Sequence, residues 1–236
     1  MKKALAVLLA VLMLGTLTAL AESGVPPAVI EDTLTVFKYF SGEVTEVIAY
    51  DDARGGFMYN VFIETADSGP ISFNVDQESG DLTGAVPEKG DVFKGYYDID
   101  RPIPLIWPPN YYAFSYAVNP GETEYLINGE KLDAPEPFML GKELMVPVRA
   151  ICEALGHTVR WNSEENVAEL GAAIRFSLIS EYYIVGRMAP IELGSSPVII
   201  NDTAFVPLSF FRNVVTMNNA YFAEGQVVIN NEEKME

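Results

Sequence analysis

Histidine and cysteine are almost absent from this sequence, which contains one of each, His157 and Cys152, in 236 residues. Copper sites need several imidazoles and catalytic zinc needs about three protein ligands, so these two residues cannot build either centre. We therefore expect no metal site and no cofactor. A single cysteine also excludes an intramolecular disulfide framework, so stability has to come from ordinary hydrophobic cores.

Long apolar runs are missing beyond the N-terminus. Lys2 and Lys3 precede an apolar run from Ala4 to about Leu14, and 19–21 supplies the small residues of a cleavage site, which predicts a secretory signal peptide over 1–21. The alternative is an uncleaved anchor. No later run approaches the ~20 apolar residues of a membrane span. We expect no transmembrane segment in the mature chain and an extracytoplasmic location, either secreted or associated with the cell surface.

Basic residues are scarce: 15 Lys and Arg stand against 33 Asp and Glu, giving a formal charge of −18. Removal of 1–21 takes away two lysines and no acid, so the charge becomes −20. Such a chain repels phosphate backbones, which disfavours nucleic acid as a partner. Acidity of this kind is typical of solubility.

Catalytic signatures are also missing. Cys152 and His157 are five residues apart, which on a helix turns their side chains by about 140°, and no nucleophile elbow, phosphate loop or dinucleotide glycine pattern occurs. Asp98 and Asp100 lie too close in sequence to resemble the carboxylate pair of a glycosidase. The acidic loop 76–81 has several oxygen ligands but not the spacing of a calcium motif, which favours a solvated hairpin loop. We therefore expect that the protein is not an enzyme. The alternative is a secreted hydrolase with an unrecognised carboxylate site.

The N-terminal half, 22–118, has the pattern of a β-rich domain. Alternating apolar and β-branched residues separated by turn formers predict strands at 42–48, 58–65, 71–75, 91–97 and 112–118. Five or six short strands favour a small all-β barrel or sandwich. This half resembles the oligonucleotide/oligosaccharide-binding (OB) type of small barrel, and 119–124 is expected to be a linker.

An aromatic loop before the last of these strands is the best candidate for binding. It reads Ile-Trp-Pro-Pro-Asn-Tyr-Tyr over 106–112, and its adjacent prolines stiffen the backbone. Trp107, Tyr111 and Tyr112 would then be held in place for a sugar ring or a peptide at little entropic cost. The alternative is that Trp107 and Tyr112 fold back over the barrel end as part of its core.

The C-terminal half is organised around 145–161, which reads as strand end, helix and second strand. Pro147 suits the first helical turn and Gly156 suits a left-handed helix stop. Between them Val148, Ile151, Cys152 and Leu155 fall at helical spacing, which predicts that they form one buried stripe.

The same pattern recurs at an offset of 60 residues. The segment 137–148 aligns with 197–208, both reading as two apolar strands that end in Val-Pro, and the strand 167–170 aligns with 227–230. This predicts an internal repeat of one hairpin-helix-hairpin unit. Because one copy buries little surface alone, we expect both copies to pack as one domain.

Four motifs in this half resemble the copper amine oxidase N-terminal-like domain family, which is common in secreted proteins of Gram-positive bacteria. They are Leu-Ile-Asn-Gly at 126–129, Val-Pro-Val-Arg at 146–149, Glu-Ala-Leu-Gly at 153–156 and Val-Arg-Trp at 159–161. The resemblance implies an α+β domain over 125–230, with an acidic tail at 231–236, and a fold that carries neither copper nor a quinone cofactor. The second copy departs from the pattern at Ser209, where arginine is expected, and at Thr216, which replaces the glycine stop.

These observations favour a non-catalytic secreted or cell-envelope-associated protein with binding or positioning domains. The expected partner is cell-wall glycan, peptide or another secreted protein. The alternative is an inhibitor or assembly partner of another secreted protein. The sequence leaves the oligomeric state open.

Overall fold

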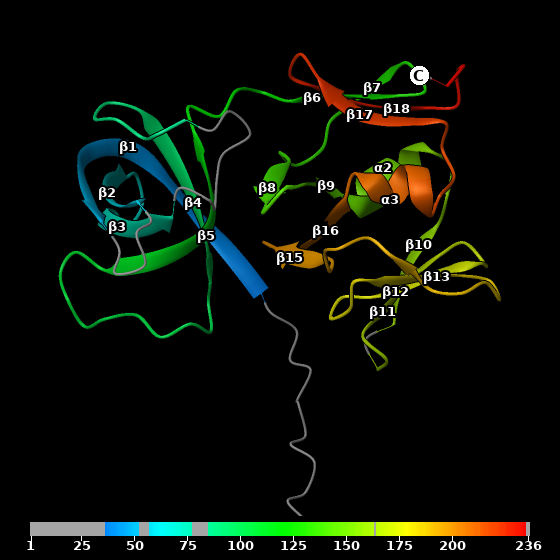
Figure 1. Cartoon of the computed structure of the whole chain (residues 1–236), viewed down its shortest axis with the longest axis horizontal. Helices are drawn as coiled ribbons and strands as arrows, with labels where there is room; N and C mark the ends of the chain where they lie inside the picture. The colour runs from blue at the N-terminus through cyan, green and yellow to red at the C-terminus, as the bar shows by residue number, and fades with distance from the viewer. Residues whose placement is uncertain (1–35, 52–56, 77–84, 163, 235–236) are drawn as a thin grey trace, which may run out of the picture. The chain divides into compact units, whose positions relative to one another are not determined.

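Strands make up most of the residues that the structure describes (Figure 1). The structure, a computed structural model, describes residues 36–51, 57–76, 85–162 and 164–234. The expected signal peptide, 1–21, and all but the first residue of the acidic loop 76–81 lie outside the described residues. The helices that the structure describes, α2 (Val148–Ala154) and α3 (Ser209–Asn213), are both too short to cross a membrane.

The first five strands close into a small barrel. They are β1 (Val36–Asp51), β2 (Phe57–Thr65), β3 (Gly69–Asp76), β4 (Val92–Asp98) and β5 (Asn110–Val118). Around the barrel the order is β1-β2-β3-β5-β4 and back to β1. The β3–β5 pair is parallel and the other four pairs are antiparallel. The small barrel and its five expected strands are therefore confirmed.

Closure depends on β1, whose 16 residues pair with β4 through one end and with β2 through the other. The change of partner occurs at Gly42, where a Cβ would collide with the carbonyl oxygen of Glu64. A register irregularity between Val44 and Glu46 follows directly. Glycine and a bulge at this point let one strand bend around the barrel.

The barrel is filled by alternate residues of its strands, among them Val61, Phe73 and Phe93, which are completely buried. The Phe73 and Phe93 ring centroids lie 5.6 Å apart. Gly95 on β4 leaves the space that these two rings fill, since a Cβ there would lie 2.8 Å from each. The period-two pattern thus places one face of every strand inside a single hydrophobic core.

The remaining strands form three groups. The barrel sheet continues from β1 through β15 (Val198–Ile200), β16 (Thr203–Pro207), β9 (Glu143–Pro147) and β8 (Phe138–Leu140). A five-stranded sheet contains β10 (Val159–Asn162), β11 (Val167–Leu170), β12 (Ile174–Ser177), β13 (Tyr182–Val185) and β14 (Ile191–Glu192). A four-stranded sheet contains β17 (Asn219–Ala223), β18 (Gln226–Asn230), β6 (Glu124–Ile127) and β7 (Glu130–Leu132). Residues of both helices and of all three groups share one hydrophobic core.

Helix α2 begins one residue later than the sequence suggests, because Pro147 is its N-cap and not its first helical residue. Gly156 takes the expected left-handed conformation, with φ +83°, and the His157 N–H donates to the Cys152 carbonyl at 2.9 Å. Ile151 and Cys152 are completely buried. The helix stop is therefore as predicted, and so is the buried stripe except at Leu155, which is only partly buried.

Helix α3 ends at Asn213, and the chain takes a left-handed conformation without a glycine two residues beyond its C-cap, Val214. Thr216 has φ +64°, and the Met217 N–H donates to the Phe211 carbonyl at 2.9 Å. A β-branched residue in this conformation is strained by about 1 kcal/mol. Because most of the described chain is strand, the protein is mostly β; the α+β class and the duplicated unit stay predictions.

Candidate functional site

The β4–β5 loop, 99–109, exposes more large apolar side chains than any other connection in the described chain. Leu105 is fully exposed, Trp107 is 76% exposed and Ile106 is 58% exposed. Ile99 and Ile103 are also exposed. The loop runs outside the barrel strands (Figure 1). Single exposed apolar residues are common, but a contiguous group of this kind marks an interaction site.

The loop backbone has a sharp turn at its tip. The Ile106 N–H donates to the Pro104 carbonyl at 3.0 Å, which closes a three-residue turn centred on Leu105. Leu105 does not have a positive φ, so this is the common inverse γ-turn. Pro102 precedes the turn, Pro104 is its first residue, and a further proline pair, 108–109, follows it. Prolines fix φ, and they restrict the residue before them as well.

The loop is held at both ends by the barrel. At its start the Arg101 N–H donates to the Asp98 carbonyl at 3.4 Å, and the Arg101 guanidinium lies 3.9 Å from the centre of the Tyr112 ring. At its end the Ser72 N–H donates to the Pro109 carbonyl at 2.9 Å. These contacts fix the loop ends on β4, β3 and β5.

A chain of polar side chains supports the loop end from within the barrel strands. Asn60 Nδ2 donates to Asn74 Oδ1 at 3.0 Å, and Asn74 Nδ2 donates to Asn110 Oδ1 at 2.6 Å. Asn110 Nδ2 donates to Ser72 Oγ at 2.8 Å, and Ser72 Oγ donates to the Pro109 carbonyl at 3.4 Å. We call Asn60, Asn74, Asn110 and Ser72 the amide chain. It connects three strands to the last residue of the loop.

The structure separates the three residues that the sequence suggests for binding. Trp107 is exposed and does not fold back into the core. Tyr111 packs against the barrel core, with its ring 4.5 Å from Tyr97 and 5.8 Å from Phe73. Tyr112 is half-buried below Arg101. Whether any of them binds a ligand stays a prediction.

Leu105 and Ile106 are the most exposed apolar neighbours of Trp107, and sequence reasoning based on aromatic residues missed them. A signal was present. Prolines on both sides of 105–107 prevent regular helix or strand there, and no Asp or Glu occurs between Asp100 and Glu122 in a chain with 33 acidic residues. A segment of this length without an acidic residue is unusual in such an acidic chain.

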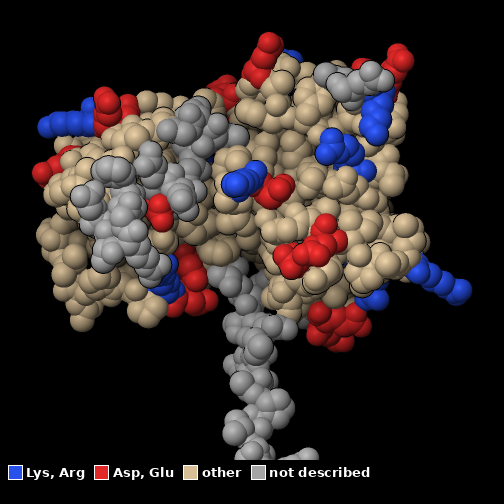
Figure 2. All heavy atoms as spheres, viewed as in Figure 1, with Lys and Arg blue, Asp and Glu red and all other residues tan. Residues whose placement is uncertain are grey.

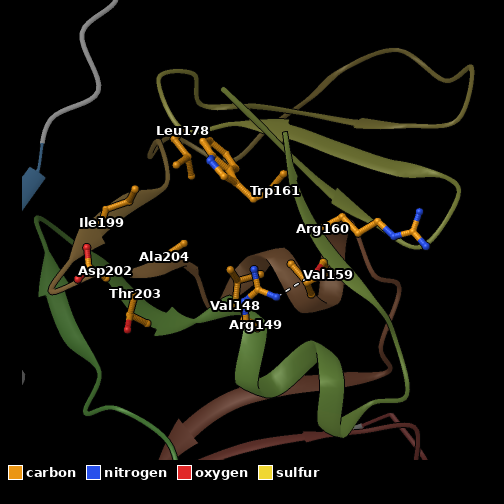
Figure 3. Close-up of a pocket in the computed structure, with 11 residues that line it drawn as sticks. Val148, Arg149, Val159, Arg160, Trp161, Leu178, Ile199, Asp202, Thr203 and Ala204 are labelled. Atoms are coloured by element: carbon orange, nitrogen blue, oxygen red, sulfur yellow. Dashed lines mark hydrogen bonds between the residues drawn. The ribbon is translucent and has the colours of Figure 1, made fainter. Parts of the chain in front are cut away.

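A second candidate site is a cavity of about 300 Å³ beside helix α2. Figure 3 shows Val148, Arg149 and Val159 around it, with Trp161 and Leu178 above them. Most of the lining is apolar. Arg149 Nη1 donates to the Val159 carbonyl at 3.0 Å and lies 3.5 Å from Glu153, and the Arg160 side chain points away (Figure 3). Arg149 therefore links α2 to β10. Asp202 and Thr203 also line the cavity.

Cys152 and His157, the single cysteine and the single histidine of the chain, lie in different environments. Cys152 is buried, and burial raises the pKa of its thiol to about 12, so the nucleophilic thiolate is absent at neutral pH. His157 is exposed. No cluster of three or more His, Cys, Asp or Glu side chains able to hold a metal occurs among the residues that the structure covers.

Charged residues are scattered on the face shown in Figure 2, where Lys, Arg, Asp and Glu lie singly or in small groups within a larger area of other residues. No continuous basic tract is visible on that face. A nucleic-acid surface would need such a tract, and the net charge of −18 opposes one.

Comparison with known proteins places a family in the C-terminal half. Residues 126–230 match the copper amine oxidase N-terminal domain family, which confirms the predicted resemblance. The chain is also 30% identical over 93 residues to a protein of Brevibacillus choshinensis named "Protease inhibitor". The matched segment covers 38% of this chain and only 28% of that protein. No solved structure matches.

Proposed function

We propose that this chain, in which residues 126–230 are a copper amine oxidase N-terminal domain, is a non-catalytic extracytoplasmic binding protein. In this proposal the β4–β5 loop contacts the partner. The observation that carries it is the exposure of Leu105, Ile106 and Trp107 on a loop whose ends are fixed by the barrel. A partner would cover apolar surface that now faces water, and each Å² that it buries would stabilise the complex by about 25 cal/mol.

Barrel topology supports the choice of loop. The order β1-β2-β3-β5-β4-β1, with β3 parallel to β5, is that of the OB barrel. In OB barrels the loop between the fourth and fifth strands is one of the two that contact ligands. The partner classes that fit are cell-wall glycan, peptide and another secreted protein. Nucleic acid is disfavoured by the charge of −18.

Support for a non-catalytic role comes from two sides. The matched family is a non-catalytic domain, and Cys152, the only thiol, is buried with a raised pKa. Asp98 Oδ1 accepts the backbone N–H of Asp100 at 2.9 Å, which gives one of this acidic pair a local structural role.

The test compares the two tryptophans of the chain. The mature protein, 22–236, is sedimented with cell walls of a Gram-positive bacterium, and in parallel is immobilised to capture secreted proteins from the same culture. Trp107→Ala should weaken retention in one of these arms by roughly 30-fold, the effect of losing an interface anchor. Trp161→Ala is the matched control, because Trp161 is 39% exposed and lies on β10. Equal behaviour of both variants, or no retention of the wild type, would contradict the proposal.

A second candidate function is inhibition of a protease. It is favoured by the similarity to the Brevibacillus protein named "Protease inhibitor", although that similarity covers only part of each chain. An inhibitor is also a non-catalytic binding protein, so both candidates make the same demand on the β4–β5 loop. The two candidate functions differ in the partner, so identification of the partner decides between them.

A further inference from the structure

At the tip of the β4–β5 loop, the backbone donors that are left for a partner occur at alternate residues. The even-numbered positions from 102 to 108 have no free N–H group. Three of them are prolines, and the fourth, Ile106, donates its N–H to the Pro104 carbonyl. The other set, at 103, 105 and 107, keeps its N–H groups and makes no hydrogen bond with them within the described chain. The loop can therefore donate backbone hydrogen bonds to a partner from these three residues, one of which lies at the turn itself.

The side chains add a second constraint. Leu105 stands at the turn, is fully exposed and contacts no core, while Ile106 and Trp107 follow it. A single aliphatic side chain at the apex of a convex loop fits a pocket and not a flat surface. No acidic residue lies between Asp100 and Glu122, so the loop would enter an apolar cleft without burying a carboxylate.

The support of the loop ends supplies a third element. Arg101 is fixed to β4 and Pro109 is fixed to β3, and the amide chain ends on the Pro109 carbonyl. Prolines and these bonds reduce the number of conformations that the loop loses on binding, which increases affinity without new contacts. Fixed ends also keep the two sides of the tip together if its peptide bond is cut.

We propose that Leu105 is the specificity residue of an inhibitory loop and fills the apolar S1 pocket of a secreted serine endopeptidase. The inference rests on the proposed role of the β4–β5 loop and names its partner. Serine endopeptidases select substrates largely by the residue before the cleaved bond, through the shape and charge of the S1 pocket. The N–H groups of Ile103, Leu105 and Trp107 pair with the edge of the cleft, and the Leu105–Ile106 peptide bond lies at the catalytic serine.

Cleavage of that bond is slow and reversible in this arrangement. Hydrolysis adds one water molecule and gives a carboxylate on Leu105 and an amine on Ile106. Because the barrel holds both new ends, they stay in the cleft, where loss of the same water molecule restores the bond. An unconstrained peptide of the same sequence would leave the cleft after hydrolysis.

The experiment measures inhibition of chymotrypsin, subtilisin and trypsin by the mature chain, with chromogenic peptide substrates. The wild type should inhibit chymotrypsin or subtilisin, whose S1 pockets are apolar, and not trypsin. Leu105→Ala should weaken that inhibition roughly 30-fold or more. Leu105→Lys should transfer inhibition to trypsin, whose S1 pocket carries an aspartate. Met188→Ala, a change at an exposed apolar residue on another loop, should have no effect.

Loss of folding should not account for these effects. Because Leu105 is fully exposed, its variants should have the same Tm as the wild type. Absence of inhibition by the wild type would overturn the inference, as would equal inhibition by Leu105→Ala. Rapid cleavage after Leu105 without inhibition, detected by mass spectrometry, would make the loop a substrate only. Leu105-dependent binding to phosphatidylcholine vesicles without inhibition would assign the loop to a membrane.

The inhibitor inference and the proposed binding function can be refuted separately. If no endopeptidase is inhibited but retention on cell walls still depends on Trp107, the inhibitor inference falls and the binding function stands. If retention in both arms is independent of Trp107 and no endopeptidase is inhibited, the β4–β5 loop is not a binding element and both proposals fall.

Discussion

Replacement of Asn110 by alanine should destabilise the barrel and loosen the base of the β4–β5 loop together. Asn110 is buried at the start of β5. Its Nδ2 donates to Ser72 Oγ at 2.8 Å and its Oδ1 accepts from Asn74 Nδ2 at 2.6 Å. Asn110→Ala removes both bonds and leaves the Asn74 amide without this acceptor.

The expected cost follows from these contacts. Each hydrogen bond contributes about 1 kcal/mol, and an unsatisfied donor costs about 1 kcal/mol more when, like Asn74, it is only partly buried. The free energy of unfolding should fall by about 2–3 kcal/mol. For a protein of this size each kcal/mol lowers Tm by about 2–4 °C, so Tm should fall by about 4–12 °C.

Thermal unfolding followed by circular dichroism measures this change, with Asn218→Ala as the control. Asn218 is exposed, and its Nδ2 donates to the carbonyls of Asn231 and Glu232, both at 3.0 Å. Its loss should cost less than about 1 kcal/mol, because water replaces the exposed bonds. If both variants melt at the same temperature, the amide chain does not stabilise the barrel and the reasoning about the loop base is refuted.

Three further changes test the fold. Gly95→Ala should lower the free energy of unfolding by about 1–3 kcal/mol, because its Cβ would lie 2.8 Å from two buried aromatic rings. The control, Gly121→Ala, places its Cβ in open space and should change the stability little. Equal chemical denaturation midpoints of the two variants would contradict this. Thr216→Gly should raise stability by up to about 1 kcal/mol, since glycine takes φ +64° without strain; a lower Tm would oppose this. Burial raises the pKa of Cys152 to about 12 and raises that of Tyr125, so above about pH 9 the unfolded chain binds fewer protons than the folded one. Stability should therefore fall from pH 9 to 11, and a flat Tm profile would count against the buried assignment of these groups.

Local patterns were sufficient for the barrel strands and for the end of helix α2. Each barrel strand has alternating residues that face one core, and Gly156 marks the helix stop in the sequence. The left-handed residue beyond α3 was not predictable, because Thr216 is a poor residue for that conformation. Phe210 and Phe211 of α3 are completely buried in the core.

Closure of the barrel depends on long-range pairing that no local pattern encodes. β3 and β5 pair in parallel although about 33 residues separate them, and β1 has two partners. The strands β12, β13 and β14 were also missed, since 174–192 has only short apolar stretches. Burial in a shared core fixes them, through residues such as Phe176 and Tyr183.

The candidate site shows the same division. Prolines and apolar residues identified the loop, but the sequence could not tell which side chains face water. Tyr111 is turned inward because it lies on β5, whose register with β3 aligns it with Phe73. Trp107 lies before the strand and has no such pairing, so it stays exposed. The exposed position of Leu105 could not be predicted from the sequence, because it depends on the turn at the tip of the loop.

The central claim is that the β4–β5 loop is covered by the partner, and tryptophan fluorescence tests it directly. The chain has two tryptophans, so Trp161→Phe leaves Trp107 as the only reporter. Its emission should shift to shorter wavelength and become protected from acrylamide quenching when cell walls or an inhibited endopeptidase are added. In Trp107→Phe the signal of Trp161 should not change. Unchanged quenching of Trp107 under conditions in which the protein is bound would contradict the account.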